Sequence, residues 1–106
     1  MKTFKLSNSG ERGWFIGNFS KAIYQTKDFE VCYQCNPRGH TDSHYHKEIT
    51  EINLIISGSL LINGELLGPG EVYVMYPGDI SQLQYLEESQ VVAIKTPSIP
   101  NDKFLL

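Results

Sequence analysis

GHTDSHYHKEITEINLIISG, residues 39–58, is the stretch that decides the fold. Within it, His44 and His46 are two positions apart, so on an extended strand their side chains project from the same face. Glu51 follows His46 by five positions, an odd offset that would turn its side chain to the opposite face of an uninterrupted strand. We expect a corner at residues 47–50 to reset this alternation, so that Glu51 faces the same point as the two histidines.

Two imidazoles and one carboxylate that converge suit a divalent ion such as iron, manganese, nickel or zinc, with coordination positions left open. The residues alone leave two other interpretations. His44, His46 and Glu51 could form a metal-free polar pocket in which a histidine–glutamate pair satisfies its own buried hydrogen bonds. The histidines could also be surface residues of an edge strand.

Short apolar runs, separated by Gly, Pro, Asn and Asp, continue on both sides of this stretch, and no segment has helical periodicity. This pattern is typical of an all-β chain. Asn63 and Gly64 give the strongest hairpin signal, and residues 52–56 are apolar on both faces, as in a strand covered on both sides. The predicted strands span residues 29–35, 44–46, 51–56, 60–62, 65–67, 71–76, 80–86 and 90–95.

The two ends of the chain give weaker signals. Residues 3–6 and 13–19 are candidates for short additional strands, whereas Pro97 and Pro100 are expected to end regular pairing. About eight short strands joined by turns, with no linker or internal repeat, favour a single-domain β-barrel or jelly roll.

Composition narrows the classes of partner. The chain has 106 residues, of which 41% are hydrophobic and 20% charged, which fits one folded domain. Its net charge is −3 and no run of Lys or Arg forms a basic stripe, so we expect neither nucleic acid nor a membrane surface as a partner. Because the sequence has no apolar stretch of signal-peptide or bilayer-spanning length, we expect a cytoplasmic protein.

The two cysteines form a C-x-x-C motif, which raises the possibilities of zinc binding and redox chemistry. Cys32 and Cys35 lie in an alternating segment, however, and an offset of three places their thiols on opposite faces of a strand. A redox pair would also need a helix N-terminus to lower a thiol pKa. The favoured interpretation is therefore two ordinary strand residues.

The spacing of the glycines, histidines and Glu51 in the opening stretch resembles the first motif of the cupin superfamily, G-x5-H-x-H-x3,4-E-x6-G. The matching positions are Gly39, His44, His46, Glu51 and Gly58, with the gap from Gly39 to His44 one residue short. The segment from Gly70 resembles the second cupin motif, G-x5-P-x-G-x2-H-x3-N, with Gly78 in place and Pro77 one position beyond the usual proline. The resemblance implies a metal held by the histidines and glutamate of the first motif.

The second motif departs from the family where a ligand is normally found. Ser81 occupies the position of the last histidine ligand, and Tyr85 occupies that of the final asparagine. Both residues are predicted to line the pocket, whereas Gln82 would point away from it. Three protein ligands plus water suffice in many catalytic metal sites, so a divalent ion remains the predicted cofactor.

The resemblance implies a double-stranded β-helix, or jelly-roll, over residues 1–106. Its parts would be N-terminal strands in 1–35, motif one in 39–58, motif two in 70–85, and a C-terminal strand and tail in 90–106. It also implies a homodimer, for which the apolar residues 14–19 are a candidate contact surface.

Three functions from different classes stay open. The first is a metal-dependent enzyme acting on a small polar molecule, and the second is a non-catalytic small-molecule binding or sensing module. The third is a metal-free isomerase or epimerase in which His46, oriented by Glu51, acts as a base. Residues 96–104 resemble the tail of small cupins of sugar metabolism, which favours a polar, carbohydrate-like ligand.

Overall fold

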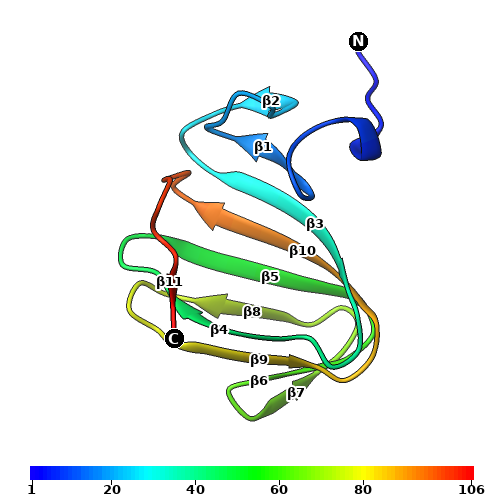
Figure 1. Ribbon diagram of the computed structural model, residues 1–106, viewed down its shortest axis with the longest axis vertical. Helices are drawn as coiled ribbons and strands as arrows, with labels where there is room; N and C mark the ends of the chain where they lie inside the picture. The colour runs from blue at the N-terminus through cyan, green and yellow to red at the C-terminus, as the bar shows by residue number, and fades with distance from the viewer.

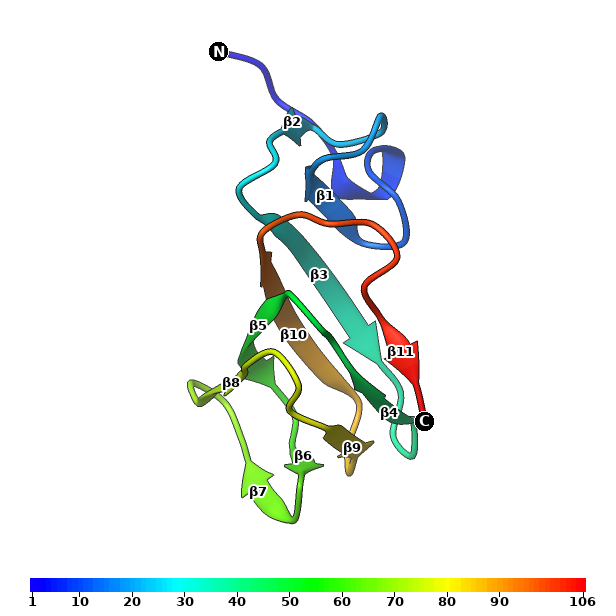
Figure 2. The same cartoon turned by 90° about the vertical axis from the view of Figure 1, so that its left-hand side faces the viewer.

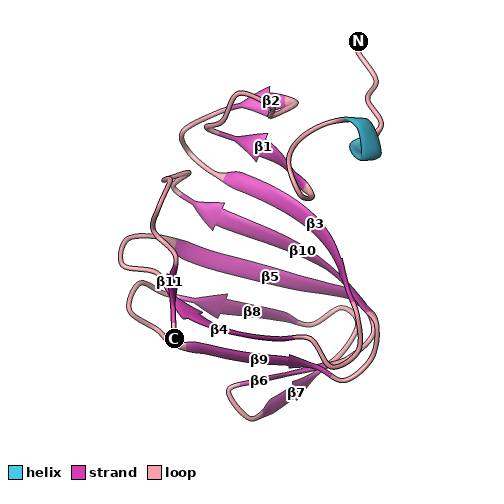
Figure 3. Ribbon diagram, in the orientation of Figure 1, coloured by secondary structure: helices cyan, strands magenta, loops and turns pink.

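The computed structural model describes residues 1–106 and is built almost entirely from strands, which confirms the predicted all-β class (Figures 1 and 3). One 3-10 helix, η1 (Leu6–Asn8), precedes them, and no helix is long and apolar enough to cross a membrane. The strands are β1 (Trp14–Gly17), β2 (Tyr24–Gln25), β3 (Glu30–Asn36), β4 (Thr41–Tyr45), β5 (Thr50–Ser57), β6 (Leu60–Ile62), β7 (Glu65–Leu67), β8 (Val72–Met75), β9 (Ser81–Tyr85), β10 (Ser89–Thr96) and β11 (Phe104–Leu105).

The strands form two sheets, and from β3 onward the chain passes back and forth between them (Figures 1 and 2). One sheet has the order β2-β1-β3-β10-β5-β8, and the other has the order β11-β4-β9-β6-β7. Because each crossing moves the chain to the other sheet, β4 and β5 belong to different sheets although only four residues separate them. The two sheets therefore bring the two halves of the opening motif together from different layers.

The interior has an apolar end and a polar end. The inward-facing residues of β5 show the change, since Ile55 lies at the apolar end, whereas Asn53 and Glu51 follow toward the polar end. Each fully buried apolar side chain contributes roughly 1.5–3 kcal/mol to stability, so the apolar end supports the barrel without the polar one. The buried cluster at the apolar end consists of Ile55, Leu60, Ile62, Tyr85 and Val91.

The structure differs from the predicted strands at the two ends of the chain. Residues 3–6 form no strand, and η1 begins at Leu6 instead. The prediction that pairing ends at the C-terminal prolines was wrong, because β11 follows them and pairs with β4, Phe104 opposite Tyr45. A proline interrupts a ladder locally, but it does not prevent the chain from pairing again once it has turned back onto the other sheet.

The outer surface of the larger sheet carries an unusually apolar face. In its β3-β10-β5-β8 part, two rows of paired residues face outward, and with Ile56 they make up what we call the outer apolar face. Nothing in the chain covers it, since Val72 and Ile56 are 52% and 44% exposed, so the prediction that residues 52–56 are covered on both sides was wrong for the isolated chain. The rows are Val31, Ile94, Ile52 and Val74, and Tyr33, Val92, Leu54 and Val72.

The two cysteines lie on opposite faces of β3, as their spacing predicts. Cys32 is fully buried inside the barrel and Cys35 is exposed, and both are free thiols. Burial raises the pKa of the Cys32 thiol to about 11, so this thiol stays protonated at neutral pH.

Gly58, the last residue of the opening motif, is required by the backbone. Its φ of +89° is unfavourable for other residues, and a Cβ there would lie 2.1 Å from Oγ of Ser89 and 2.6 Å from the carbonyl oxygen of Glu88. Gly64 has a similar φ of +82° but open space around the corresponding position. Substitutions at these two glycines can therefore distinguish the cost of backbone strain from the cost of a steric clash.

We expect Gly58→Ala to lower the free energy of unfolding by at least about 3 kcal/mol, because strain and clash add. Gly64→Ala, the matched control, should cost only about 1–2 kcal/mol, since it introduces strain alone. Chemical denaturation of both variants measures the difference. Equal losses would contradict the close approach of Gly58 to Ser89.

Candidate metal centre

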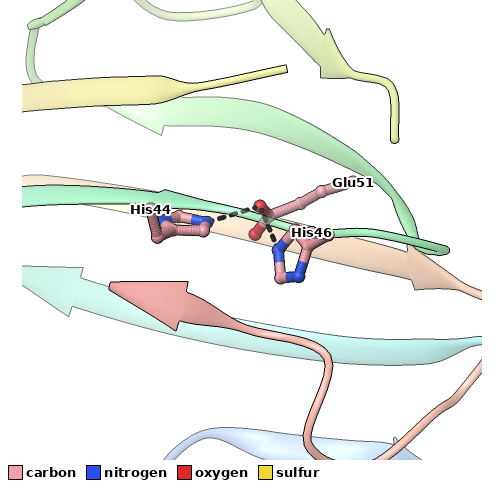
Figure 4. Close-up of side chains that lie close together, drawn as sticks. All are labelled: His44, His46 and Glu51. Atoms are coloured by element: carbon pink, nitrogen blue, oxygen red, sulfur yellow. Dashed lines mark hydrogen bonds and ion pairs between the residues drawn. The ribbon is translucent and has the colours of Figure 1, made fainter. Parts of the chain in front are cut away.

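The corner between β4 and β5 brings the three predicted residues together. His44 is the fourth residue of β4, His46 is the first residue after it, and Glu51 is the second residue of β5. Their side chains point toward one another inside the barrel (Figure 4). The Nε2 atoms of His44 and His46 lie 3.2 Å and 3.3 Å from the same atom, Oε2 of Glu51. One potential ligand atom from each residue lies within 4.8 Å of the other two.

All three side chains are buried, so their charges matter. His44, His46 and Glu51 are 6%, 3% and 8% exposed. Burial opposes ionisation of Glu51, but the contacts with both histidines outweigh it and hold the pKa of this carboxyl well below its usual range. Burial also opposes the charged form of His44, yet Asp42 and Glu51 raise its pKa above the ordinary value. The site therefore holds an ionised carboxylate that attracts positive charge.

The outer nitrogen of each imidazole is occupied by an acceptor. Nδ1 of His46 lies 2.6 Å from the backbone carbonyl oxygen of Asp102 and must donate to it, because a carbonyl oxygen only accepts. Nδ1 of His44 lies 2.6 Å from Oδ2 of Asp42, close enough to require a proton on this nitrogen, although the contact is not an aligned hydrogen bond. In the neutral form, each ring then directs the lone pair of Nε2 at Glu51.

Three acceptor atoms consequently point at one small volume. Two imidazole lone pairs facing a carboxylate oxygen at 3.2 Å and 3.3 Å repel it unless positive charge lies between them. A proton on each Nε2 would supply that charge by making both rings cationic. A single divalent cation would supply it while both rings stay neutral.

Asp102 holds the corner that positions His46, and nothing in the sequence pointed to this role. Its carboxylate accepts hydrogen bonds from the backbone N–H groups of Lys47, Glu48 and Ile49, at 3.1, 2.9 and 2.9 Å. Burial opposes its ionisation, but these three bonds outweigh it and lower the pKa of Asp102. Because its partners lie more than 50 residues away in the sequence, no local pattern could have identified the contact.

The two predicted pocket residues have different surroundings. Ser81 is buried and pairs with His44 across the β4–β9 ladder, so the two side chains are neighbours on the inner face. Tyr85 is buried in the apolar cluster, and its hydroxyl accepts a hydrogen bond from Nδ2 of Asn36 at 3.1 Å. Burial raises the pKa of Tyr85 to about 12, so this hydroxyl remains protonated at neutral pH.

Two cavities adjoin the three residues. A cavity of about 380 Å³ is lined by His44, Glu51 and Tyr85, together with Asn53 and Tyr73, but Ser81 is not part of its wall. A second cavity, of about 410 Å³, reaches His46 from the other side of the corner. Both volumes suit a small molecule rather than a polymer. The residues shared by both walls are Arg12, Trp14, Lys95 and Lys103.

Solved structures with this arrangement of strands include a double-stranded β-helix protein from Klebsiella pneumoniae, which is 20% identical over 98% of this chain and 90% of its own, with a TM-score of 0.71. Pac13 from Streptomyces, solved with uridine, is 14% identical over 100% of this chain and 92% of its own, with a TM-score of 0.71. Oxalate decarboxylase from Bacillus subtilis is 19% identical over 76% of this chain and 24% of its own, with a TM-score of 0.67. This chain has the cupin fold.

These identities establish the fold alone, so a function for this chain has to be inferred from the site itself. No family model matches the sequence. No curated protein matches it either. Within the cupin barrel, the first motif supplies the β4–β5 corner, and the second supplies β8 and β9, with Gly70 and Gly78 at positive φ in the turns beside them.

We expect Asp102→Asn to destabilise the protein by about 1–2 kcal/mol at pH 6, because an amide cannot accept as strongly from the three backbone donors. The folded-state pKa of Asp102 is lowered, so its contribution is present above the ordinary value of 3.8 and is lost as pH falls through the folded-state pKa. The difference between parent and variant should therefore shrink below about pH 4.

Chemical denaturation at several pH values, without added metal, measures this difference. Asp28→Asn is the matched control, because Asp28 is exposed and its carboxylate makes no hydrogen bond. A loss of stability that stays constant down to pH 3 would contradict the role of an ionised Asp102.

Proposed function

We propose that this cupin is a metal-dependent enzyme that acts on a small polar molecule, with a divalent ion held by His44, His46 and Glu51. The observation that carries the proposal is the convergence of three acceptor atoms on one buried point. Iron(II), manganese, nickel and zinc all accept two imidazoles and one carboxylate.

The spacing of the donor atoms supports a metal of this kind. Ligand atoms about 2.1 Å from a common ion lie about 3.0–3.4 Å from one another in octahedral or tetrahedral sites. Two of the three spacings lie within that interval, those from Nε2 of His44 and His46 to Oε2 of Glu51, at 3.2 Å and 3.3 Å. The third, between the two histidines, is no more than 4.8 Å. The contacts of Asp42 and Asp102 with the outer nitrogens correspond to the outer-shell partners that fix the tautomer of metal-binding histidines.

A bound divalent ion would polarise a carbonyl or carboxylate oxygen of the substrate, or activate a water molecule or dioxygen. The chain's own side chains orient the substrate and limit the access of water. Tyr85 and Asn53 lie in the same cavity wall as His44 and Glu51, so their hydroxyl and amide groups are candidates to contact a polar ligand. Burial raises the pKa of Tyr73, so its hydroxyl in this wall donates rather than ionises.

The structural neighbours support an enzymatic function acting on small polar molecules. Pac13 is a nucleoside dehydratase, and oxalate decarboxylase has Mn(II) centres. This chain spans about a quarter of oxalate decarboxylase, with 24% of that chain covered, so the similarity concerns one barrel. The binding-module and metal-free alternatives become the better interpretation if the metal test below fails.

We also propose that the protein is a cytoplasmic homodimer, with the outer apolar face as the contact. Residues 14–19, the surface expected from the sequence, serve this role poorly because Trp14 and Phe19 line the cavity near His46. The outer apolar face is a better candidate, since its two rows hold no charged residue and Val72 and Val74 are 52% and 37% exposed.

We expect His46→Ala to weaken metal binding by more than about 100-fold, because a direct ligand contributes more than the outer-shell partners whose loss costs 10- to 100-fold. The fold should persist, since the apolar cluster lies at the other end of the barrel. Isothermal titration with Mn(II) or Zn(II) measures affinity, and circular dichroism checks the fold. His40→Ala, which changes an exposed loop histidine, is the matched control.

A substitution that adds a possible ligand tests the same site. Ser81→His should strengthen metal binding, because position 81 is the cross-strand neighbour of His44 on the inner face. If titration shows affinity no greater than that of the parent, position 81 does not reach the ion. If neither the parent nor this variant binds a divalent metal, the proposed function fails.

We expect light scattering to give a mass twice that of one 12.0 kDa chain. Val74→Glu should shift the protein toward the monomer, because a buried unpaired carboxylate is costly in an apolar contact. Leu66→Glu, which changes an exposed leucine on β7, should leave the dimer intact. A monomeric parent would contradict the dimer.

A further inference from the structure

The cavity beside the candidate metal centre gathers positive charge in a chain of net charge −3. Three cationic residues, Arg12, Lys95 and Lys103, line the wall that also holds His44. That wall contains two carboxylates, those of Asp42 and Glu51, and each of them contacts a histidine. In this wall the cations outnumber the carboxylates by one, and Lys103 lies 3.7 Å from Oδ2 of Asp42. The adjoining cavity shares the three cations and adds the carboxylates of Glu11, Glu30 and Asp102.

Lys95 lies directly across the sheet from one of the candidate ligands. It pairs with Glu51 across the β10–β5 ladder and with Glu30 across the β10–β3 ladder, so its side chain shares the inner face with both. It nevertheless forms no ion pair, because Oε2 of Glu51 is turned toward the two histidines. Its ammonium lies 4.7 Å from the centre of the Trp14 ring. Lys95 therefore makes no ion pair, although its charge favours the ionised form of Glu30, its neighbour across the ladder.

Asn53 supplies an independent observation. It is 4% exposed and lies two residues after Glu51 on the inner face of β5. Its Nδ2 is buried and has no hydrogen-bond partner, and Asn53 is one of the residues that line the cavity. Buried amide donors are nearly always satisfied, so an unpartnered one in a residue that lines a cavity points to an acceptor on a ligand.

The ladder places these two donors around an open position. Asn53 pairs with Ala93 and Glu51 pairs with Lys95, so Asn53 and Lys95 are diagonal neighbours on one face. Ala93, between them along the ladder, has a side chain of one carbon and also lines the cavity. An ammonium and an amide N–H on either side of a small residue match the two oxygens of a carboxylate.

We propose that the substrate carries a carboxylate, which Lys95 and Asn53 bind beside the candidate metal centre. This inference rests on the proposed function, since another oxygen of the same molecule would reach the ion. Arg12, which is exposed and lines both cavities, stands at the entrance and attracts the anion. A phosphate is the less suitable anion, because one ammonium and one amide neutralise a single negative charge.

Isothermal titration with matched pairs of compounds tests the preference for an acid. The pairs are D-glucuronate with D-glucose and L-lactate with 1,2-propanediol, and inorganic phosphate is a separate probe. In Mn(II)-loaded protein, each acid should bind about tenfold tighter than its neutral partner or better, as expected for hydrogen bonds to a charged group. Equal affinities within both pairs, or phosphate binding tighter than both acids, would overturn the proposal.

Two variants assign the preference to the proposed residues. Lys95→Met and Asn53→Leu should each reduce the affinity for the acids and leave that for the neutral partners unchanged. Lys21→Met, a matched change on the exposed surface, should alter neither. Asn53→Leu should also keep or raise the melting temperature without ligand, because it removes an unsatisfied buried donor. An unchanged acid preference in both cavity variants would overturn the assignment.

Separate titrations distinguish this inference from the proposed function. Tight Mn(II) binding together with equal affinities for acids and neutral partners overturns the carboxylate site and leaves the metal centre in place. A preference for acids that Lys95→Met abolishes, in a protein that binds no divalent metal, supports the carboxylate site and overturns the metal centre.

Discussion

The β4–β5 corner is the constraint on which the rest of the site depends. In an uninterrupted strand, Glu51 would point away from His44 and His46, because side chains alternate. The corner prevents this by moving the chain from one sheet to the other within four residues. It is stable inside the protein only because Asp102 accepts three of its backbone N–H groups, which would otherwise be unpaired away from water. The same tail residue fixes the proton on His46 through its own carbonyl. One residue thus determines both the path of the backbone and the direction of a lone pair.

The apolar core and the candidate metal centre lie at opposite ends of the barrel. The apolar cluster around Ile55 and Leu60 occupies one end, and the buried polar groups occupy the other. Polar groups that lack partners destabilise a fold, so an interior with an unpaired Asn53 amide and three converging acceptor atoms requires compensation elsewhere. The apolar end supplies it. This division permits unpaired polar groups at the end that holds the candidate metal centre, and functional sites are the usual location of such groups.

The sequence predicts what depends on local pattern. Alternation and turn residues predict the all-β class, and the spacing of His44, His46 and Glu51 predicts their convergence. Contacts between distant segments could not be predicted in this way. Asp102 and β11 act through partners 50 or more residues away, and two prolines concealed that the chain pairs again after them. The outer apolar face is exposed because no other layer covers β5 and β8. The sequence of these strands alone does not indicate whether such a layer is present. The missing partner of Asn53 appears only when every neighbouring acceptor has been located.

The net charge of the candidate metal centre bears on which substrate would suit it, and so does Ser81 at the position of the last histidine of the second motif. A divalent ion held by two neutral imidazoles and Glu51 would keep one net positive charge in a buried site. Charges in such surroundings are costly unless they are paired. Ser81, next to His44, contributes no charge, and a serine at the position of a histidine ligand would leave more of the coordination sphere to a substrate. A substrate that brings one carboxylate would reduce the positive charge that this ion and Lys95 together place in the cavity. The replacement of a histidine by Ser81 and the unpaired lysine therefore favour the same kind of ligand, a small organic acid with more than one oxygen to donate.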